Sequence, residues 1–134
     1  EGRIQYVEHV TPQHLWRAAD VNPLRLDEAF IVADDPIETA ARWARFAALL
    51  PAPHGEGVRL ETHRGRIFIG TREAVAKLLG NAPPAPAIAG YALACGHPDA
   101  LAARCRKLGV ALEKRGARYA AQLPAALGSV WLFG

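Results

Sequence analysis

The sequence contains two stretches with the same order of residue types, and this repeat limits the folds open to the chain. Residues 26–36 read LDEAFIVADDP, and residues 88–98 read IAGYALACGHP. Each is an apolar segment typical of a β-strand, then a polar turn, then a proline where a helix would begin. In the first stretch Asp35 is suited to cap the helix, and Glu38 completes a capping-box-like pattern. We therefore expect two copies of one strand–helix unit.

The residues that follow each copy predict further strands and a shorter helix. Residues 57–61 (GVRLE) and 109–113 (GVALE) have matching patterns, and we interpret them as equivalent strands. Thr71 is suited to cap a short helix that Gly80 closes. The other expected elements are strands over residues 3–10, 29–33, 66–69, 117–123 and 129–133, and helices over 36–50 and 98–108. The apolar stripes expected to face the core are Ile37, Ala40, Trp43 or Ala44, Ala47 and Leu50 in one helix, and Leu101, Cys105 and Leu108 in the other.

Length and linker composition predict one α+β domain made of two modules. The chain has 134 residues, which suits a single domain. We divide it into a strand and connector (1–25), a first module (26–80), a stiff proline-rich linker (81–86) and a second module (87–134). The chain begins with Glu1 and contains no methionine. We therefore expect it to be part of a longer or processed protein.

Composition argues against several classes of partner. The net charge is +3 at pH 7, and no aromatic pattern accompanies the basic residues, so we expect no nucleic-acid partner. The denser basic groups, residues 104–107 and 114–118, form either an anion-binding surface or solvated helix and hairpin faces, and we favour the second. No apolar run approaches the length of a membrane span. Cys95 and Cys105 lack zinc or redox spacing and predict reduced, buried thiols in a cytoplasmic protein.

The order of these elements resembles that of the vicinal oxygen chelate superfamily, which includes glyoxalases, bleomycin-resistance proteins and dioxygenases. The resemblance rests on the duplicated strand–helix–strand–strand–strand plan with its LDxxxxxADDP opening. The opening segment EHVTPQHLW, followed by Asn-Pro and then such a module, resembles the C-terminal part of a bacterial glyoxalase-like domain protein, and this likeness covers nearly the whole chain. The resemblance implies two βαβββ-type modules whose curved mixed sheets form a cleft, with helices on the outside.

The same resemblance implies a divalent metal in the cleft, such as Zn, Ni, Mn or Fe, and Lewis-acid chemistry on a small oxygenated compound. In the first repeat the family's usual ligand position holds Glu28, whereas the matching position of the second repeat is Gly90, which cannot ligate. Glu8 and His9 are neighbours on the expected first strand, so only one of them can face a given cleft. We take Glu8, His9 and Glu28 as candidate metal ligands, with Glu8 and Glu28 as candidate catalytic carboxylates. His54, His63 and His97 fit surface or capping positions better.

Three functions remain open from the sequence. The chain could be a metal-assisted lyase, isomerase or dioxygenase, a metal-free module that binds a small molecule as antibiotic-sequestering relatives do, or a structural half of a larger glyoxalase-like protein. Because unpaired strands at a module's edge invite partners, we expect a homodimer or a tight contact with an absent N-terminal half.

Overall fold

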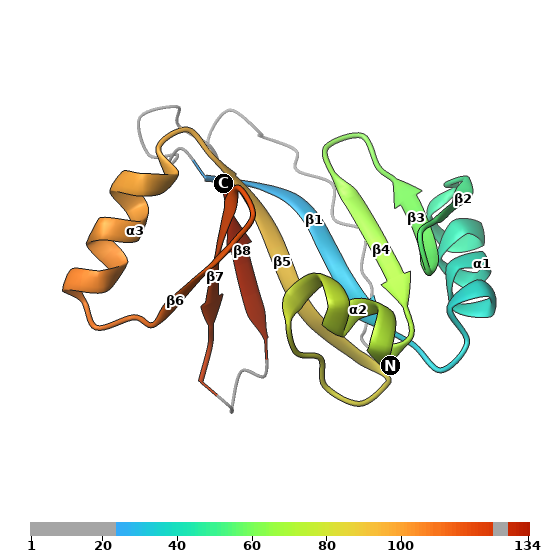
Figure 1. Cartoon of the computed structure of the whole chain (residues 1–134). Coiled ribbons are helices and arrows are strands. Elements are labelled where there is room, and N and C mark those ends of the chain that lie inside the picture. The colour runs from blue at the N-terminus through green and yellow to red at the C-terminus, as the bar shows by residue number, and fades with distance from the viewer. Residues whose placement is uncertain (1–23, 125–128) are drawn as a thin grey trace.

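The computed structural model describes residues 24–124 and 129–134, which form one eight-stranded sheet with three helices packed against it (Figure 1). The strand order is β2-β3-β4-β1-β5-β8-β7-β6. The strands are β1 (Leu24–Val32), β2 (Pro51–His54), β3 (Gly57–Glu61), β4 (Arg66–Gly70), β5 (Ala87–Cys95), β6 (Leu112–Arg115), β7 (Arg118–Gln122) and β8 (Val130–Phe133). The helices are α1 (Pro36–Ala47), α2 (Arg72–Leu79) and α3 (Pro98–Lys107).

The centre of the sheet reproduces the sequence repeat. In the repeat, Gly90 is the counterpart of Glu28 and Ala92 is the counterpart of Phe30. The antiparallel pairing of β1 with β5 sets Glu28 opposite Ala92 and Phe30 opposite Gly90. Glu28 thus pairs with the counterpart of Phe30, and Phe30 pairs with the counterpart of Glu28. A two-fold repeat predicts this reciprocal pairing. Because β4 lies parallel to β1 and β8 lies parallel to β5, the sheet is mixed and the expected α+β class is confirmed.

The outer strands correct our alignment of the two copies. Strand order places β6 at the far edge of the sheet, in the position that β2 occupies at the other edge. Residues 109–113 (GVALE) therefore lead into the counterpart of β2 and not of β3, which holds GVRLE. The sequence missed β2 because Pro51 and Pro53 suggested a loop. An edge strand tolerates proline, since one side of its backbone forms no hydrogen bonds with a neighbouring strand.

The helices lie on both faces of the sheet. Ala40 and Ala44 of α1 pack with Ile31 on one face, which we call the outer face. Val75 and Leu79 of α2 pack with Phe30 on the opposite face, which we call the cleft face. Ala102 of α3 packs with Tyr119 of β7 and Phe133 of β8, in the second repeat. The expectation of outside helices thus holds for α1 and α3, whereas α2 lies on the cleft face.

Both predicted helix caps of the first repeat are present. The Asp35 carboxylate accepts a hydrogen bond from the Glu38 N–H at 2.9 Å, and the Thr71 hydroxyl accepts one from the Ala74 N–H at 3.3 Å. Gly80 ends α2 with φ of +85°, a conformation that suits glycine. The pKa of Glu73 in the first turn of α2 is lowered, because its carboxylate accepts from its own N–H and from Thr71.

Several boundaries differ from the prediction. β1 begins at Leu24, so its first residues lie in what we took as a connector, and α1 ends at Ala47. Ile37 and Leu50 were expected in the core stripe, but they are 75% and 87% exposed. Leu108 is 72% exposed, because α3 has already ended at Lys107. Small alanines fill the positions where the helices approach the sheet most closely.

The remaining expectations concern thiols, membranes and the first strand. Cys95 and Cys105 are free thiols and only half-buried, not buried as expected. Within the described ranges, no helix is long and apolar enough to cross a membrane. The strand expected over residues 3–10 lies outside the residues that the structure describes.

Candidate functional site

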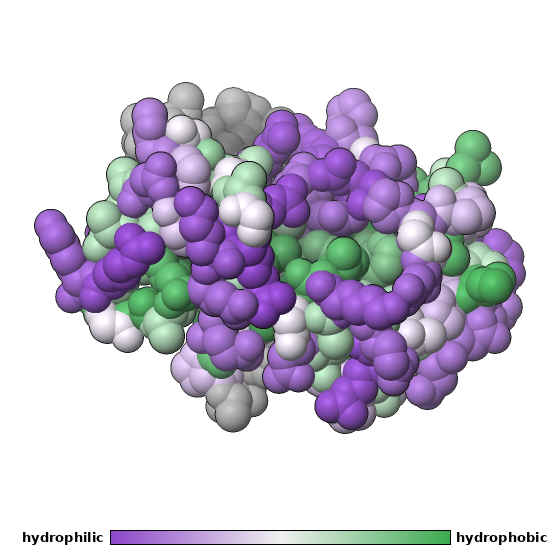
Figure 2. Space-filling view, in the orientation of Figure 1, coloured by the Kyte–Doolittle hydropathy of each residue, from purple (hydrophilic) through white to green (hydrophobic). Residues whose placement is uncertain are grey.

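The cleft face holds a cavity of about 260 Å³ between the two halves of the sheet. We call it the charged chamber. Figure 2 shows hydrophobic side chains in the middle of this face, bordered by hydrophilic ones. The chamber draws residues from β1, β2, β3, β6, β7, β8 and α2, so both halves of the sheet contribute. Its lining residues are Glu28, Phe30, His54, Arg59, Leu78, Arg115, Arg118 and Leu132.

Glu28 is the most buried charge of the charged chamber. Its exposed fraction is 4%, and its Oε1 accepts a hydrogen bond from Nε of Arg59 at 2.9 Å. Glu28 lies on β1 and Arg59 on β3, with β4 between the two strands. A buried carboxylate must be paired or pay a large desolvation cost. The guanidinium of Arg59 is therefore the described partner of the Glu28 carboxylate at the floor of the cleft.

Asp27 forms a second ionic group at the rim of the same face. The β1–β5 register shifts between Leu26 and Glu28, so Asp27 sits at an irregularity of the ladder. Its carboxylate accepts a hydrogen bond from Nη2 of Arg66 on β4, and it lies 3.7 Å from Nη2 of Arg118 on β7. Asp27 thus links arginines from the two halves of the sheet. The buried Nε of Arg66 has no hydrogen-bond partner among the described residues.

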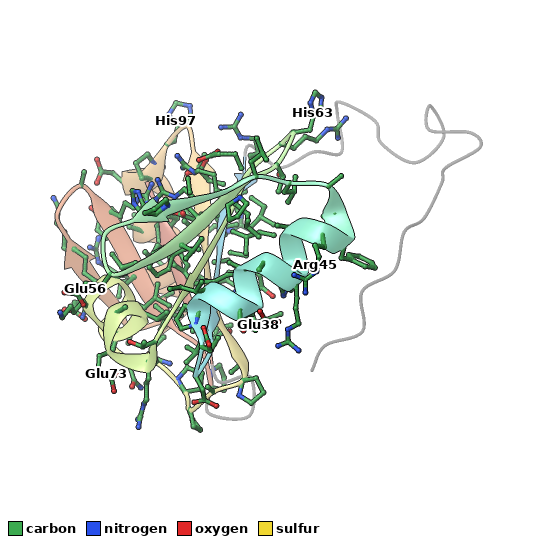
Figure 3. The ribbon with its side chains drawn as sticks, turned by 90° about the vertical axis from the view of Figure 1, so that its right-hand side faces the viewer. Glu38, Arg45, Glu56, His63, Glu73 and His97 are labelled. Carbon is green, nitrogen blue, oxygen red and sulfur yellow. The ribbon has the colours of Figure 1, made fainter. Side chains whose placement is uncertain are left out.

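His54 is the one described histidine that lines the charged chamber, and it is exposed, as the sequence suggested. It lies on β2, and its ring meets Phe68 edge-on with the centroids 6.2 Å apart. His63 and His97 fit the surface prediction: both are exposed, and Figure 3 shows them at the ends of loops, away from the body of the sheet. His97 is the N-cap residue of α3, but its side chain makes no capping hydrogen bond.

A second cavity, of about 300 Å³, lies beside the charged chamber, between α2 and the strands of the second repeat. We call it the side chamber. Arg115 lines both cavities. The other residues of the side chamber are Leu79, Gly80, Asn81, Ala111, Leu112, Glu113, Ala120, Gln122 and Val130.

The described donors do not fit a divalent metal. Glu28 already accepts from Arg59, and Asp27 is shared by Arg66 and Arg118. Among the described residues, no group of three or more His, Cys, Asp or Glu side chains could hold a metal ion. Protein metal sites of this kind need three or four such ligands, and cations that surround the carboxylates oppose a further cation. Guanidinium groups thus occupy the surroundings of the predicted ligand Glu28.

The other predicted ligand positions divide into two cases. Glu8 and His9 lie outside the described residues, so their predicted role stays a prediction. Gly90 cannot be a ligand, and the structure gives a reason for glycine there. A Cβ at Gly90 would lie 2.1 Å from the backbone oxygen of Val130, because β5 and β8 approach closely at this point. The second repeat therefore has no room for a counterpart of Glu28.

Comparison with known structures identifies the fold. Methylmalonyl-CoA epimerase from Mycobacterium tuberculosis matches with a TM-score of 0.57 and 19% identity, over 91% of this chain and 93% of that chain. A hypothetical protein from Bacillus halodurans matches with a TM-score of 0.54 and 14% identity, over 82% and 92% of the two chains. The chain has the vicinal oxygen chelate fold.

A further match within this fold carries ligands. Streptomyces coelicolor methylmalonyl-CoA epimerase, in complex with 2-nitronate-propionyl-CoA, has a TM-score of 0.51 and 19% identity, over 82% of this chain and 96% of that chain. Searches against family models and curated proteins found no match to the sequence. At these identities the similarity establishes the fold and leaves the chemistry to the residues of the cleft.

The sequence reading missed the arginines of the cleft. Arg115 and Arg118 belong to the basic group that we favoured as solvated faces, yet both line the charged chamber. The sequence could have indicated Arg59, because strand alternation in GVRLE places its side chain on the face opposite to those of Val58 and Leu60. Arg104 and Arg106 of the other basic group lie on α3, and Arg106 stacks over Tyr119 on the outer side.

Proposed function

We propose that the chain is a glyoxalase-like, small-molecule binding domain whose cleft takes an organic anion. The observation that supports this proposal is the set of charged side chains that line the charged chamber. Arg59, Arg115 and Arg118 line it together with a single carboxylate, Glu28, which Arg59 already engages. Arginine donates in a planar fork that matches carboxylate and phosphate oxygens. The apolar side chains of Phe30, Leu78 and Leu132 among these arginines suit a ligand with an organic body.

The structural neighbours suggest which anions to test first. One methylmalonyl-CoA epimerase holds methylmalonyl-CoA and NH4+, and another holds 2-nitronate-propionyl-CoA. Acyl-CoA compounds and free dicarboxylates such as malonate therefore belong in the first ligand panel, with inorganic phosphate as the simplest anion. We make no assignment of a reaction, and we place the protein in the cytoplasm as the sequence suggests.

Arg118→Gln should weaken binding of the best anion in this panel by about tenfold or more, since it removes a charge-assisted hydrogen bond. Calorimetric titration of the wild-type chain and the variant measures the loss. Arg104→Gln is the matched control, because Arg104 is an exposed arginine on α3 that lines neither chamber. Equal losses in the two variants, or no binding of any anion to the wild-type chain, would contradict the proposal.

A metal-assisted lyase, isomerase or dioxygenase is the second candidate. It is favoured by Glu28 and His54 lining one cavity on the face where the fold family places its chemistry. It requires further ligands, for which Glu8 and His9 remain the predicted sources. Elemental analysis separates the two candidates: a stoichiometric divalent metal that Glu28→Ala abolishes supports the enzyme, whereas anion binding by metal-free protein supports the binding domain.

We also propose a homodimer that packs through the outer face. Leu26, Ile88 and Trp131 are 50%, 52% and 41% exposed there. The two described edge strands are poorly suited to pair with a strand of another copy, because β2 carries two prolines and β6 is short and charged. An apolar face left open on a sheet marks an interaction surface, and a second copy supplies the same surface.

Trp131→Lys should convert this dimer to monomer, because it places a charge within the apolar face. Sedimentation equilibrium over a wide concentration range measures the mass. Leu50→Lys is the control, since Leu50 is 87% exposed in the connection that follows α1. A wild-type chain that stays monomeric at every concentration would refute the dimer.

A further inference from the structure

The two cavities of the cleft have one lining residue in common, and its side chain forms part of the wall of each. Arg115 lines both the charged chamber and the side chamber. Their volumes are about 260 and 300 Å³. Small-molecule sites in proteins span about 300 to 1,000 Å³. Each chamber alone is at or below the lower limit of this range, whereas the two joined fall well within it.

Arg115 is held loosely for a residue in this position. Its guanidinium rests on Gly80 at the end of α2, where a Cβ would lie 2.1 Å from Nη2. Its Nη2 donates to Glu113 at 2.7 Å, and the Glu113 side chain is 64% exposed. An ion pair with so exposed a partner contributes little. The buried Nε of Arg115 has no partner among the described residues, so one N–H of this side chain remains available to a ligand.

The two chambers differ in charge. Three arginines and one carboxylate line the charged chamber, whereas Glu113 and Asp27, the acidic partners of Arg115 and Arg118, are not among its lining residues. Among the described residues that line the side chamber, the charged ones are Glu113 and Arg115, and they pair with each other. Leu79, Ala120 and Val130 give that chamber an apolar wall. One end of the cleft therefore suits an acidic group, and the other suits a neutral chain.

We infer that one elongated ligand occupies both chambers, with its acidic group among Arg59, Arg115 and Arg118 and a flexible neutral chain in the side chamber. Arg115 binds the acidic group through its free N–H and moves from the shared wall to do so. The inference rests on the proposed function and extends it, because it names the ligand class: a chain-bearing organic acid, as opposed to a compact anion that fills the charged chamber alone.

A series of straight-chain monocarboxylates tests the length of the site. Acetate, butanoate, hexanoate and octanoate carry the same acidic group and differ only in methylenes. Each methylene buried in the side chamber should tighten binding about four-fold, so octanoate, with four more methylenes, should bind about 250-fold more tightly than butanoate. Calorimetric titration or ligand-observed NMR measures the affinities.

Blocking the side chamber should remove the dependence of affinity on chain length. Binding of the acidic group in the charged chamber should remain. Ala111→Trp places a large ring at the chamber from an exposed position, so the core is not repacked. Gln122→Trp does the same from β7 and serves if the first variant folds poorly. In both variants octanoate should bind less than tenfold more tightly than butanoate. Ala103→Trp, at an exposed position of α3 outside both chambers, should behave as the wild-type chain.

The outcomes separate this inference from the proposed function. Butanoate and octanoate of equal affinity, both weakened by Arg118→Gln, would overturn the two-chamber ligand and leave the anion site intact. A dependence on length that Ala111→Trp and Gln122→Trp do not change would also overturn it, because the chain would then lie elsewhere. No binding by any acid of the series or of the first panel would remove the proposed function itself.

Discussion

Arg59→Leu should lower the free energy of unfolding by about 2 to 3 kcal/mol, because it strands the carboxylate of Glu28 in the floor of the cleft. Removing one partner of a buried ion pair costs about 3 to 5 kcal/mol. We expect a loss at or just below the lower end of this range, since the Arg59 side chain is 22% exposed and two other arginines line the same chamber. Urea unfolding followed by circular dichroism measures the difference.

Two further variants show whether burial is the cause. Lys77→Leu removes a cation from an ion pair whose side chains are 64% and 61% exposed, and it should cost less than about 1 kcal/mol. The double variant Glu28→Leu with Arg59→Leu should recover much of the lost stability, because a buried pair replaced by apolar residues is often neutral. If Arg59→Leu costs no more than Lys77→Leu, the guanidinium is not what compensates the buried charge.

The local parts of the fold could be predicted from neighbouring residues. Asp35, Thr71 and Gly80 were predicted as caps, and each occupies that position in the structure. The repeat predicted two units, and the β1–β5 register reproduces it residue by residue. These features depend on short stretches of sequence or on self-similarity, which one sequence displays directly.

The cleft could not be predicted in the same way, because its contacts join residues far apart in the chain. Arg59 and Glu28 are separated by 31 positions, and Arg66 and Asp27 by 39. The register irregularity at Asp27 is set by the pairing of β1 with β5, so alternation along β1 alone does not reveal it. Family resemblance directed attention to Glu28, which lines the charged chamber with Arg59 as its partner, and its role as a metal ligand stays a prediction.

Phe68 shows how a strand sequence shapes the same face. Gly57 and Gly70 lie opposite each other in the β3–β4 ladder. A Cβ at Gly57 would lie 2.6 Å from Cζ of Phe68, and one at Gly70 would lie 2.8 Å from its Cε1. The aromatic ring therefore covers the glycine pair and fills the space that side chains would take. It also contacts the rings of Phe30 and His54, both of which line the charged chamber.

Phe68→Ala should lower the free energy of unfolding by about 4 kcal/mol, the largest loss we expect from a single substitution. Phe68 is 2% exposed, and a buried phenylalanine replaced by alanine costs about 3 to 5 kcal/mol from lost burial and the cavity left behind. Collapse cannot close the cavity readily, because two glycines supply no side-chain atoms to move into it. Urea unfolding measures the loss, with Phe46→Ala as the matched control at a 47% exposed position.

The same variant should weaken anion binding, although Phe68 does not line either chamber. Without the ring, His54 loses its edge contact, and the strands that carry Arg59 and Arg66 lose the ring that covers their glycine pair. A site must hold its groups within fractions of an ångström to bind well. Titration of Phe68→Ala at a temperature where it is fully folded should show a weaker affinity, and an unchanged affinity would mean that the arginines keep their geometry without this floor.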